Sequence, residues 1–243
     1  MSTIDTAPQR SEQQGDCPVL EGRHLVKEYT VGARTGLLRR QQTMRAVDDV
    51  SIRLTSGRVT ALVGQSGSGK STLGRMLARL IPATSGQILL EGREVPAKEG
   101  SDHRRYVGDV QLTLQDPFAS LNPLRRISYT LGRAVRIHQD ARGQQAVHQR
   151  SLELLERVGL VPAEKYLDRF PHELSGGERQ RVSFARALAA SPKVLIADEP
   201  VSMLDVTIRR EMLDLIDSLR RDEALAVLYI THDLGSARRY SDD

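Results

Sequence analysis

A glycine-rich segment, residues 64–71, contains the residue types that bind phosphate groups. It reads Gly-Gln-Ser-Gly-Ser-Gly-Lys-Ser and fits the pattern G-x-x-x-x-G-K-[ST]. Its glycines let the backbone curl so that N–H groups point at phosphate oxygens, Lys70 can reach the β and γ phosphates, and Ser71 can ligate Mg²⁺. The segment therefore predicts binding of a nucleoside triphosphate. The expected phosphate-binding residues are Gly64, Ser66, Gly67, Ser68, Gly69, Lys70, Ser71 and Thr72.

An acidic pair, Asp198 and Glu199, ends the apolar run at residues 194–197. In enzymes with a phosphate loop, an aspartate at such a strand end holds Mg²⁺, often through water. The next residue points to the other side of the strand, so Glu199 can face the γ-phosphate and polarise an attacking water. Two acids can also simply end a strand. Beside the phosphate loop, however, the pair predicts hydrolysis of the bound nucleotide.

Residues 174–180, Leu-Ser-Gly-Gly-Glu-Arg-Gln, predict the start of a helix capped by Ser175. A glycine-rich helix N-terminus is a second potential anion site. One chain does not need two such sites for one nucleotide, whereas two copies arranged head to tail would use both, with ATP between them. The alternative is a capped surface helix without a ligand.

The elements that must position these motifs follow from hydrophobic periodicity. Residues 59–63, 194–197 and 225–230 are nearly all apolar, which suits strands of a parallel sheet buried on both faces. Helical stripes separate them, one of which ends at Gly159. Alternating strands and helices predict a doubly wound α/β core. The stripe after the phosphate loop consists of Leu73, Met76, Leu77, Leu80 and Ile81.

The rest of the chain divides into three parts around this core. Residues 1–18 are polar and predict a disordered tail. Residues from 19 to 54 predict a small antiparallel sheet, interrupted by a basic loop at residues 32–42. Residues from about 123 to 178 show only helical or loop patterns, so we expect a helical subdomain inserted into the core.

Composition limits the possible partners. The 243 residues are 39% hydrophobic and 27% charged, and the net charge of +4 comes mostly from scattered arginines. Scattered arginines are typical of a solvated surface, and some of them could face anionic lipid headgroups or a nucleotide. They do not form the continuous basic stripe that would indicate a nucleic-acid partner. The single cysteine, Cys17, excludes an internal disulfide and fits a reducing compartment. No apolar run approaches the ~18 residues of a membrane span, so other chains would have to cross the membrane.

With these motifs in this order, the sequence resembles the ATP-binding subunits of ABC transporters, from residue 19 to the end. The segment at residues 174–180 resembles their signature motif. The resemblance implies a P-loop NTPase (RecA-like) core with a small antiparallel β subdomain and an inserted α-helical subdomain. It also implies that Tyr29 stacks on adenine and that Gln115 senses Mg²⁺ and the membrane partner. By the same resemblance Asp205 belongs to a loop that crosses a dimer interface, and His232 contacts the γ-phosphate.

A narrower resemblance connects the chain to the ATPases of oligopeptide, dipeptide and nickel permeases, particularly the second of their two paired subunits. It rests on residues 45–50, 115–123 and 166–173. It implies a second ABC ATPase subunit, identical or related, placed head to tail. It further implies transmembrane permease subunits, an extracytoplasmic solute-binding protein reached indirectly, and a peripheral position on the cytoplasmic face of the cell membrane.

The sequence departs from the family pattern at three places. Leu114 replaces an aromatic residue and Met203 replaces a small one, and both changes should affect packing rather than chemistry. The chain also ends at Asp243, soon after His232, where family members continue. We therefore expect a C-terminally short domain in which a sheet edge or an apolar face is left uncovered.

Taken together, the sequence predicts the ATP-hydrolysing motor of an ABC importer for peptides, with ATP and Mg²⁺ as cofactors and no nucleic-acid partner. One alternative is an ABC-type ATPase that acts on nucleic acid or ribosomes. Another is a regulatory module that binds ATP without hydrolysing it. The expected catalytic residues are Lys70, Gln115, Glu199 and His232. The metal ligands would be Ser71, Gln115 and Asp198, and the further nucleotide contacts would be Tyr29, Ser175, Gly176, Gly177, Glu178 and Asp205.

Overall fold

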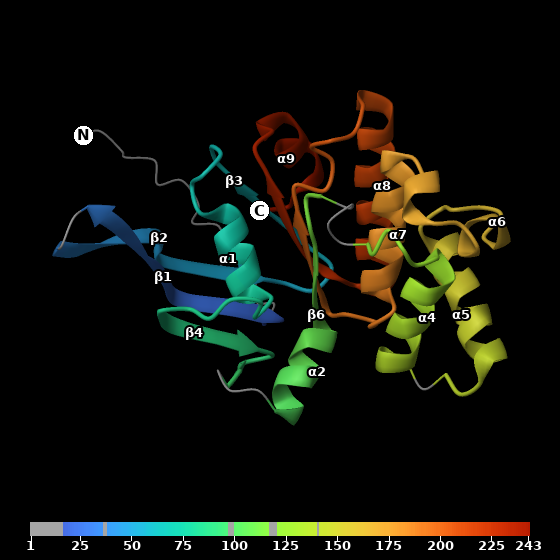
Figure 1. Ribbon diagram of the computed structural model, residues 1–243, viewed down its shortest axis with the longest axis horizontal. Coiled ribbons are helices and arrows are strands. Elements are labelled where there is room, and N and C mark those ends of the chain that lie inside the picture. Colours follow the sequence, from blue (N-terminus) through green and yellow to red (C-terminus); the bar gives the residue numbers. More distant parts are fainter. Residues whose placement is uncertain (1–16, 36–37, 97–99, 117–120, 140) are drawn as a thin grey trace, which may run out of the picture.

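Figure 1 shows a computed structural model of the chain, which describes residues 17–35, 38–96, 100–116, 121–139 and 141–243. The predicted disordered tail, residues 1–18, lies outside these ranges except for its last two residues. No helix within the described ranges combines the length and the apolar character that a membrane span requires.

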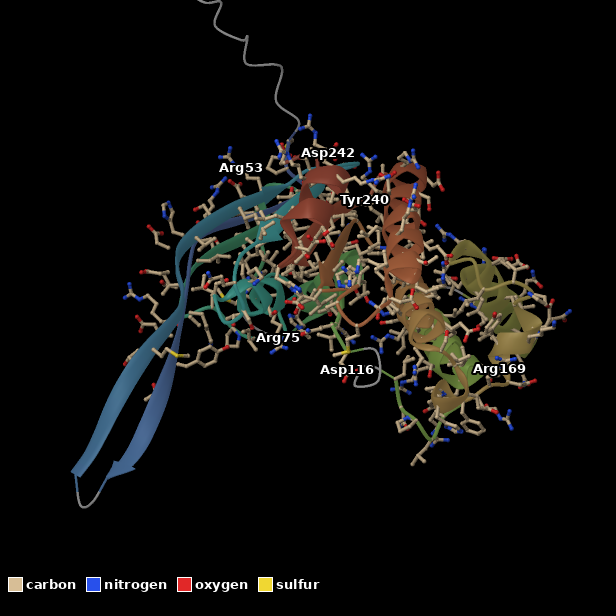
Figure 2. The ribbon with its side chains drawn as sticks, turned by 90° about the horizontal axis from the view of Figure 1, so that it is seen from above. Arg53, Arg75, Asp116, Arg169, Tyr240 and Asp242 are labelled. Atoms are coloured by element: carbon tan, nitrogen blue, oxygen red, sulfur yellow. The ribbon has the colours of Figure 1, made fainter. Side chains whose placement is uncertain are left out.

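An antiparallel sheet forms the first layer, with strand order β2-β1-β4-β5. Its strands are β1 (Leu20–Thr35), β2 (Leu38–Leu54), β4 (Ser85–Leu90) and β5 (Arg93–Glu94). The prediction of a loop at residues 32–42 is wrong, because β1 and β2 stay paired out to Thr35 and Leu38. Backbone hydrogen bonds can extend a ladder without apolar alternation in the sequence. Figure 2 shows this long hairpin extending away from the rest of the molecule.

A parallel sheet forms the second layer, with strand order β3-β8-β7-β6. It contains β3 (Val59–Val63), β6 (Val110–Thr113), β7 (Val194–Asp198) and β8 (Ala226–Thr231). Every residue of β7 and β8 is buried, as their apolar sequences predict. The carboxyl ends of β3, β7 and β8 lead directly into the segments that carry the phosphate loop, Glu199 and His232.

One edge of the parallel sheet is formed by β3, and the sequence led us to expect that a sheet edge or an apolar face would be uncovered. In the structure, the backbone N–H of Asp242 donates to the Val59 carbonyl and the N–H of Ala61 donates to the Asp243 carbonyl, at 2.9 Å each. This part of the edge is therefore paired with the backbone of residues 242–243, and the expectation of an uncovered edge does not hold at these positions.

Helix α1 (Lys70–Leu77) lies in the core between the two sheets (Figure 1). Its buried residues Leu73 and Met76 join one cluster with Ile88 of the antiparallel sheet and Ile230 of the parallel sheet. The predicted stripe is longer than the helix, which ends at Leu77. The prediction is wrong for Leu80, which is 61% exposed.

Helices cover the other face of the parallel sheet. These are α7 (Gly176–Leu188) and α8 (Val206–Glu223), whose residues share a second core cluster with Leu195 and Tyr229 of the sheet. The short helix α9 (Leu234–Tyr240) follows β8 directly. The parallel sheet is thus buried between α1 on one side and α7 and α8 on the other, as in a doubly wound α/β core.

A group of helices lies on the side of the molecule away from the antiparallel sheet (Figure 1). It contains α4 (Ile127–His138), α5 (Gln144–Arg157), α6 (Glu164–Leu167) and the 3₁₀ helix η1 (Pro171–Glu173). The described residues between 123 and 178 contain helices and loops, as the sequence pattern indicates. Helix α7 starts inside that range and continues beyond it to Leu188. Helix α2 (Ser101–Asp109) stands apart from this group and leads directly into β6.

Candidate functional site

A cavity of about 910 Å³ lies where the phosphate loop meets the antiparallel sheet. Its size falls within the range of small-molecule sites. It is lined by all of the predicted phosphate-loop residues except Ser68, namely Gly64, Ser66, Gly67, Gly69, Lys70, Ser71 and Thr72. The other predicted residues that line it are Tyr29, Gln115, Glu199 and His232.

The phosphate loop connects β3 to α1 through a backbone conformation that depends on glycine. Gly69, the N-cap of α1, has a φ of 91°, and a Cβ atom there would lie 2.1 Å from the Ala46 carbonyl oxygen. No side chain caps the N-terminus of α1. The first N–H groups of the helix therefore remain available, together with the positive end of its dipole, to an anion in the cavity.

Lys70, the first residue of α1, is only 7% exposed. Its Nζ donates hydrogen bonds to the carbonyl oxygens of Gly64 and Gln65, at 2.8 Å each. The ammonium group is thus held over the loop by two neutral acceptors. Phosphate oxygens would be stronger acceptors for the same donors, because both partners would then be charged.

Ser71, which lines the cavity, contacts Asp198, which is not among the cavity's lining residues. Ser71 Oγ donates to Asp198 Oδ1 at 2.9 Å, and Asp198 is only 2% exposed. Burial raises the pKa of the Asp198 carboxyl above its usual value, against the Ser71 hydrogen bond and the positive charges of Arg75 and Lys70. A hydroxyl beside a carboxylate is an oxygen donor set that Mg²⁺ prefers.

The described residues contain no group of three or more His, Cys, Asp or Glu that could hold a metal ion by itself. Mg²⁺ is usually bound through one or two carboxylates and completed by water and substrate phosphates. Ser71 and Asp198 therefore fit the predicted metal. Gln115, the third predicted ligand, directs its amide nitrogen at Glu199 instead.

Glu199 lies one residue beyond β7, where its N–H donates to the Ile230 carbonyl at 3.0 Å. Its φ of 46° places it in the left-handed region, which is unusual for a residue other than glycine. Its Oε2 accepts a hydrogen bond from Gln115 Nε2 at 3.0 Å and lies 3.4 Å from His232 Nδ1. Three predicted catalytic side chains from three segments thus converge. A carboxylate held in this way can orient a water molecule and accept its proton.

Tyr29 lies on β1 directly opposite Met44 of β2, and both side chains line the cavity. Tyr29 is 37% exposed, and Lys27 Nζ lies 5.2 Å from the centroid of its ring. The ring is accessible for stacking against a planar group. Sequence reasoning did not identify Met44, because its position opposite Tyr29 depends on the register of a hairpin whose connection was expected to be a loop.

The remaining predicted nucleotide contacts lie outside the cavity. Ser175 Oγ accepts from the Glu178 N–H at 3.2 Å, and Glu178 Oε2 accepts from the Ser175 N–H at 2.7 Å, so the start of α7 is closed by a capping box.

Asp205 caps α8 by accepting from the Ile208 N–H at 3.0 Å. Ile208 also lies against Gly177, so the N-termini of α7 and α8 are adjacent. The cavity residues do not include Ser175, Gly176, Gly177, Glu178 or Asp205.

The chain is similar to known proteins over most of its length. A family model described as ABC transporter matches residues 47–202. The glutathione import ATP-binding protein GsiA of Shigella dysenteriae is 44% identical over 225 residues, and that of Salmonella paratyphi A is 42% identical. Each alignment covers 92% of this chain and 35% of the relative, so the chain spans about a third of the length of these relatives.

A solved structure extends the comparison to the fold. The ATP-binding cassette MJ0796, dimeric in a post-hydrolysis state with ADP and Pi, matches with a TM-score of 0.79 and 25% sequence identity. The match covers 92% of this chain and 91% of that one. The predicted fold, an α/β P-loop core with an antiparallel sheet and additional helices, is thereby confirmed. The chain belongs to the ABC transporter family.

Proposed function

We propose that the chain is the ATP-binding and ATP-hydrolysing motor subunit of an ABC importer. The observation that carries the proposal is the position of Glu199, held by Gln115 and His232 in the same cavity that the phosphate loop lines. A phosphate loop alone indicates only binding of a nucleotide. A carboxylate, an amide and an imidazole gathered beside it provide the groups that hydrolysis requires.

In the bound state, the triphosphate lies against the loop N–H groups and the N-terminus of α1, and the base stacks on Tyr29. Lys70 Nζ then exchanges the carbonyl oxygens of Gly64 and Gln65 for phosphate oxygens, without leaving its buried position. Ser71 and Asp198 would hold Mg²⁺, which when bound neutralises charge on the phosphates.

Glu199 positions a water molecule against the γ-phosphorus and accepts its proton as the new P–O bond forms. The bond to the bridging oxygen breaks, so the products are ADP and inorganic phosphate. The hydrogen bond from Gln115 fixes the rotamer of the carboxylate, and His232, which is 59% exposed, is free to contact the γ-phosphate. This is positioning and electrostatic catalysis, as phosphoryl transfer generally requires.

A second ABC subunit placed head to tail would complete the site. The residues Ser175 to Gly177 do not line the cavity of their own chain, which leaves them free to contact the nucleotide of a neighbouring molecule. The similar cassette MJ0796 is dimeric in its solved structure, which supports this arrangement. The partner is an identical or a related chain, and ATP between the two subunits acts as a switch for their association.

Coupling to transport would involve transmembrane permease subunits in contact with the region of Gln115, and through them an extracytoplasmic solute-binding protein. The chain would then lie on the cytoplasmic face of the membrane as a peripheral subunit. The name of the GsiA relatives, glutathione import ATP-binding protein, supports a small peptide as the cargo.

The proposed activity is tested by measuring Mg²⁺-dependent ATP hydrolysis by the purified chain over a range of protein concentrations. Activity should rise faster than linearly with concentration. Glu199→Gln should still bind Mg-ATP but lose at least about 100-fold in turnover, as expected for removal of a general base. Lys70→Ala should be inactive, and Glu164→Gln, an exposed acid on α6, serves as the control. Wild-type turnover by Glu199→Gln would contradict the proposed role.

The importer assignment needs a separate test. The chain is reconstituted with peptide-importer permease subunits in proteoliposomes, and uptake of radiolabelled glutathione is measured with and without ATP. We expect uptake that depends on ATP and is lost with Glu199→Gln. Stimulation of ATP hydrolysis by RNA, without any effect of the permease, would instead support an ATPase that acts on nucleic acid.

A further inference from the structure

Arg209, in the first turn of α8, connects two segments that flank Glu199. Its backbone N–H donates to the Asp205 carbonyl at 2.8 Å as part of the helix. Its side chain turns back toward the preceding loop, residues 202–205, where Nη2 donates to the Leu204 carbonyl at 3.4 Å. The guanidinium therefore contacts the loop that ends at the cap of α8.

This loop is itself attached to the backbone of Glu199. The Ser202 N–H and the Ser202 hydroxyl both donate to the Glu199 carbonyl, at 3.3 and 3.1 Å. The Leu204 N–H donates to the Val201 carbonyl at 3.2 Å. A displacement of the loop would thus pull on the residue that carries the catalytic carboxylate.

On its other side, Arg209 faces the segment that carries His232. A small cavity of about 20 Å³ is lined by Arg209 together with Glu199 and Ser202 and with Thr231, His232 and Asp233. Asp233 caps α9 by accepting from the N–H groups of Gly235 and Ser236, at 2.9 and 3.3 Å. These hydrogen bonds, with a smaller contribution from the positive charge of Arg209, hold the pKa of Asp233 below its usual value.

The Nε of Arg209 is buried and has no hydrogen-bond partner among the described residues. A buried donor without a partner costs stability, so Arg209 is held here by its Nη2 contact with the loop and by packing rather than by a full set of hydrogen bonds. We propose that Arg209 is a positioning residue for ATP hydrolysis, which holds the loop at residues 202–205 and the segment of His232 and Asp233 in one arrangement around Glu199. This inference rests on the proposed function.

The kinetic test compares Arg209→Gln with Arg210→Gln. Arg210 is the adjacent residue of α8, but its side chain is 69% exposed and lies 4.0 Å from Asp214, away from the loop. We expect Arg209→Gln to lower kcat about tenfold and to change KM for ATP by less than twofold, because the phosphate loop is intact. Arg210→Gln should retain wild-type values for both.

A double-mutant cycle with Asp233→Asn tests whether Arg209 acts through the segment of His232. Asparagine keeps a capping oxygen for α9 and removes the charge. If Arg209 acts through Asp233, the double variant should lose little more kcat than the more impaired single variant. Losses that simply multiply would contradict the coupling.

A spectroscopic readout does not depend on turnover. The ring signal of His232, assigned by its loss in His232→Gln, is followed by NMR in the presence of Mg²⁺ and a slowly hydrolysed ATP analogue. It should move in Arg209→Gln and stay in place in Arg210→Gln. If the wild-type chain hydrolyses no ATP, the proposed function fails and this measurement still decides the role of Arg209.

Two results would overturn the inference. One is an Arg209→Gln protein with kcat within twofold of wild type and an unmoved His232 signal. If Arg209→Gln does not fold, Arg209→Lys replaces it, because lysine keeps the charge but not the planar guanidinium. For Arg209→Lys we expect a smaller loss of kcat, about threefold, and a shifted His232 signal. Wild-type values of both in Arg209→Lys would be the second contradicting result.

Discussion

Two glycine-rich helix N-termini in this molecule have similar sequences and opposite surroundings. The N-terminus of α1 has no side-chain cap, faces the cavity and carries a buried lysine. The N-terminus of α7 is closed by hydrogen bonds between Ser175 and Glu178 and does not line the cavity. The first leaves its N–H groups for a ligand within the same chain, whereas the second is satisfied without one. Of these two helix N-termini, only that of α1 both lines the cavity and lacks a side-chain cap.

The largest effect is expected from Gly69→Ala at the start of α1. The new Cβ would lie 2.1 Å from the Ala46 carbonyl oxygen at a φ of 91°, so the loop has to change shape. We expect Mg-ATP affinity to fall at least about 100-fold, which corresponds to about 2.8 kcal/mol. The measurement is a titration with a fluorescent ATP analogue. Gly67→Ala, with a φ of 80° but no atom within 4 Å, is the control for backbone strain alone and should lose less.

The corresponding change at α7 is Gly177→Ala, whose Cβ would lie 2.6 Å from Ile208 Cγ2. A side chain can move where a backbone carbonyl cannot, so we expect a loss of about 1–3 kcal/mol in the free energy of unfolding. Mg-ATP affinity of the isolated chain should stay unchanged. The free energy of unfolding is measured by urea denaturation. Gly176→Ala is the control, because a Cβ atom there would lie 3.6 Å from Leu204 Cδ2, which is an ordinary van der Waals contact. This variant should have the same free energy of unfolding as wild type.

A smaller effect is expected from Ser175→Ala, which removes the acceptor for the Glu178 N–H. Loss of a helix cap should lower the free energy of unfolding by about 1 kcal/mol. Ser175→Asn keeps a capping oxygen and should recover most of this stability. If both variants unfold at the same urea concentration as wild type, the capping box does not stabilise α7.

The smallest effect is expected from Glu178→Gln. Burial raises the pKa of the Glu178 carboxyl, but hydrogen bonding by Ser175 outweighs it and holds the pKa below the usual value. A lowered folded-state pKa stabilises the chain above the unfolded-state pKa, and this contribution is lost as the pH falls through the folded-state value. The variant should therefore lose a few tenths of a kcal/mol at pH 7. The difference from wild type, measured by urea denaturation, should shrink below about pH 4.

The sequence was sufficient to predict the parts of the fold that are buried on two sides. The apolar runs at β3, β7 and β8 and the start of α1 at Lys70 agree with the structure. The site could be predicted for a related reason: its residues directly follow these buried strands, whose carboxyl ends meet at one edge of the sheet. The hydrophobic pattern of a segment predicts its secondary structure when all of its residues lie in the same environment, as in a strand buried on both faces.

The strand and the helix that the sequence did not predict, β6 and α2, combine buried residues with more exposed ones without a regular order. Strand β6 contains Gln111 and Thr113, and α2 buries only Tyr106, so neither shows a clear period. Met44 and Arg209 were missed for another reason. Their roles depend on which residue lies across a hairpin or beside a helix turn, and such register is a property of tertiary pairing rather than of local sequence.

The left-handed backbone conformation at Glu199 affects which substitutions the chain tolerates at this position. At such a φ a residue with a side chain costs roughly 1–2 kcal/mol relative to glycine. Random substitution would therefore favour Glu199→Gly for stability while removing the carboxylate from Gln115 and His232. The carboxylate at this position, with its contacts to Gln115 and His232, therefore comes at a cost in folding stability.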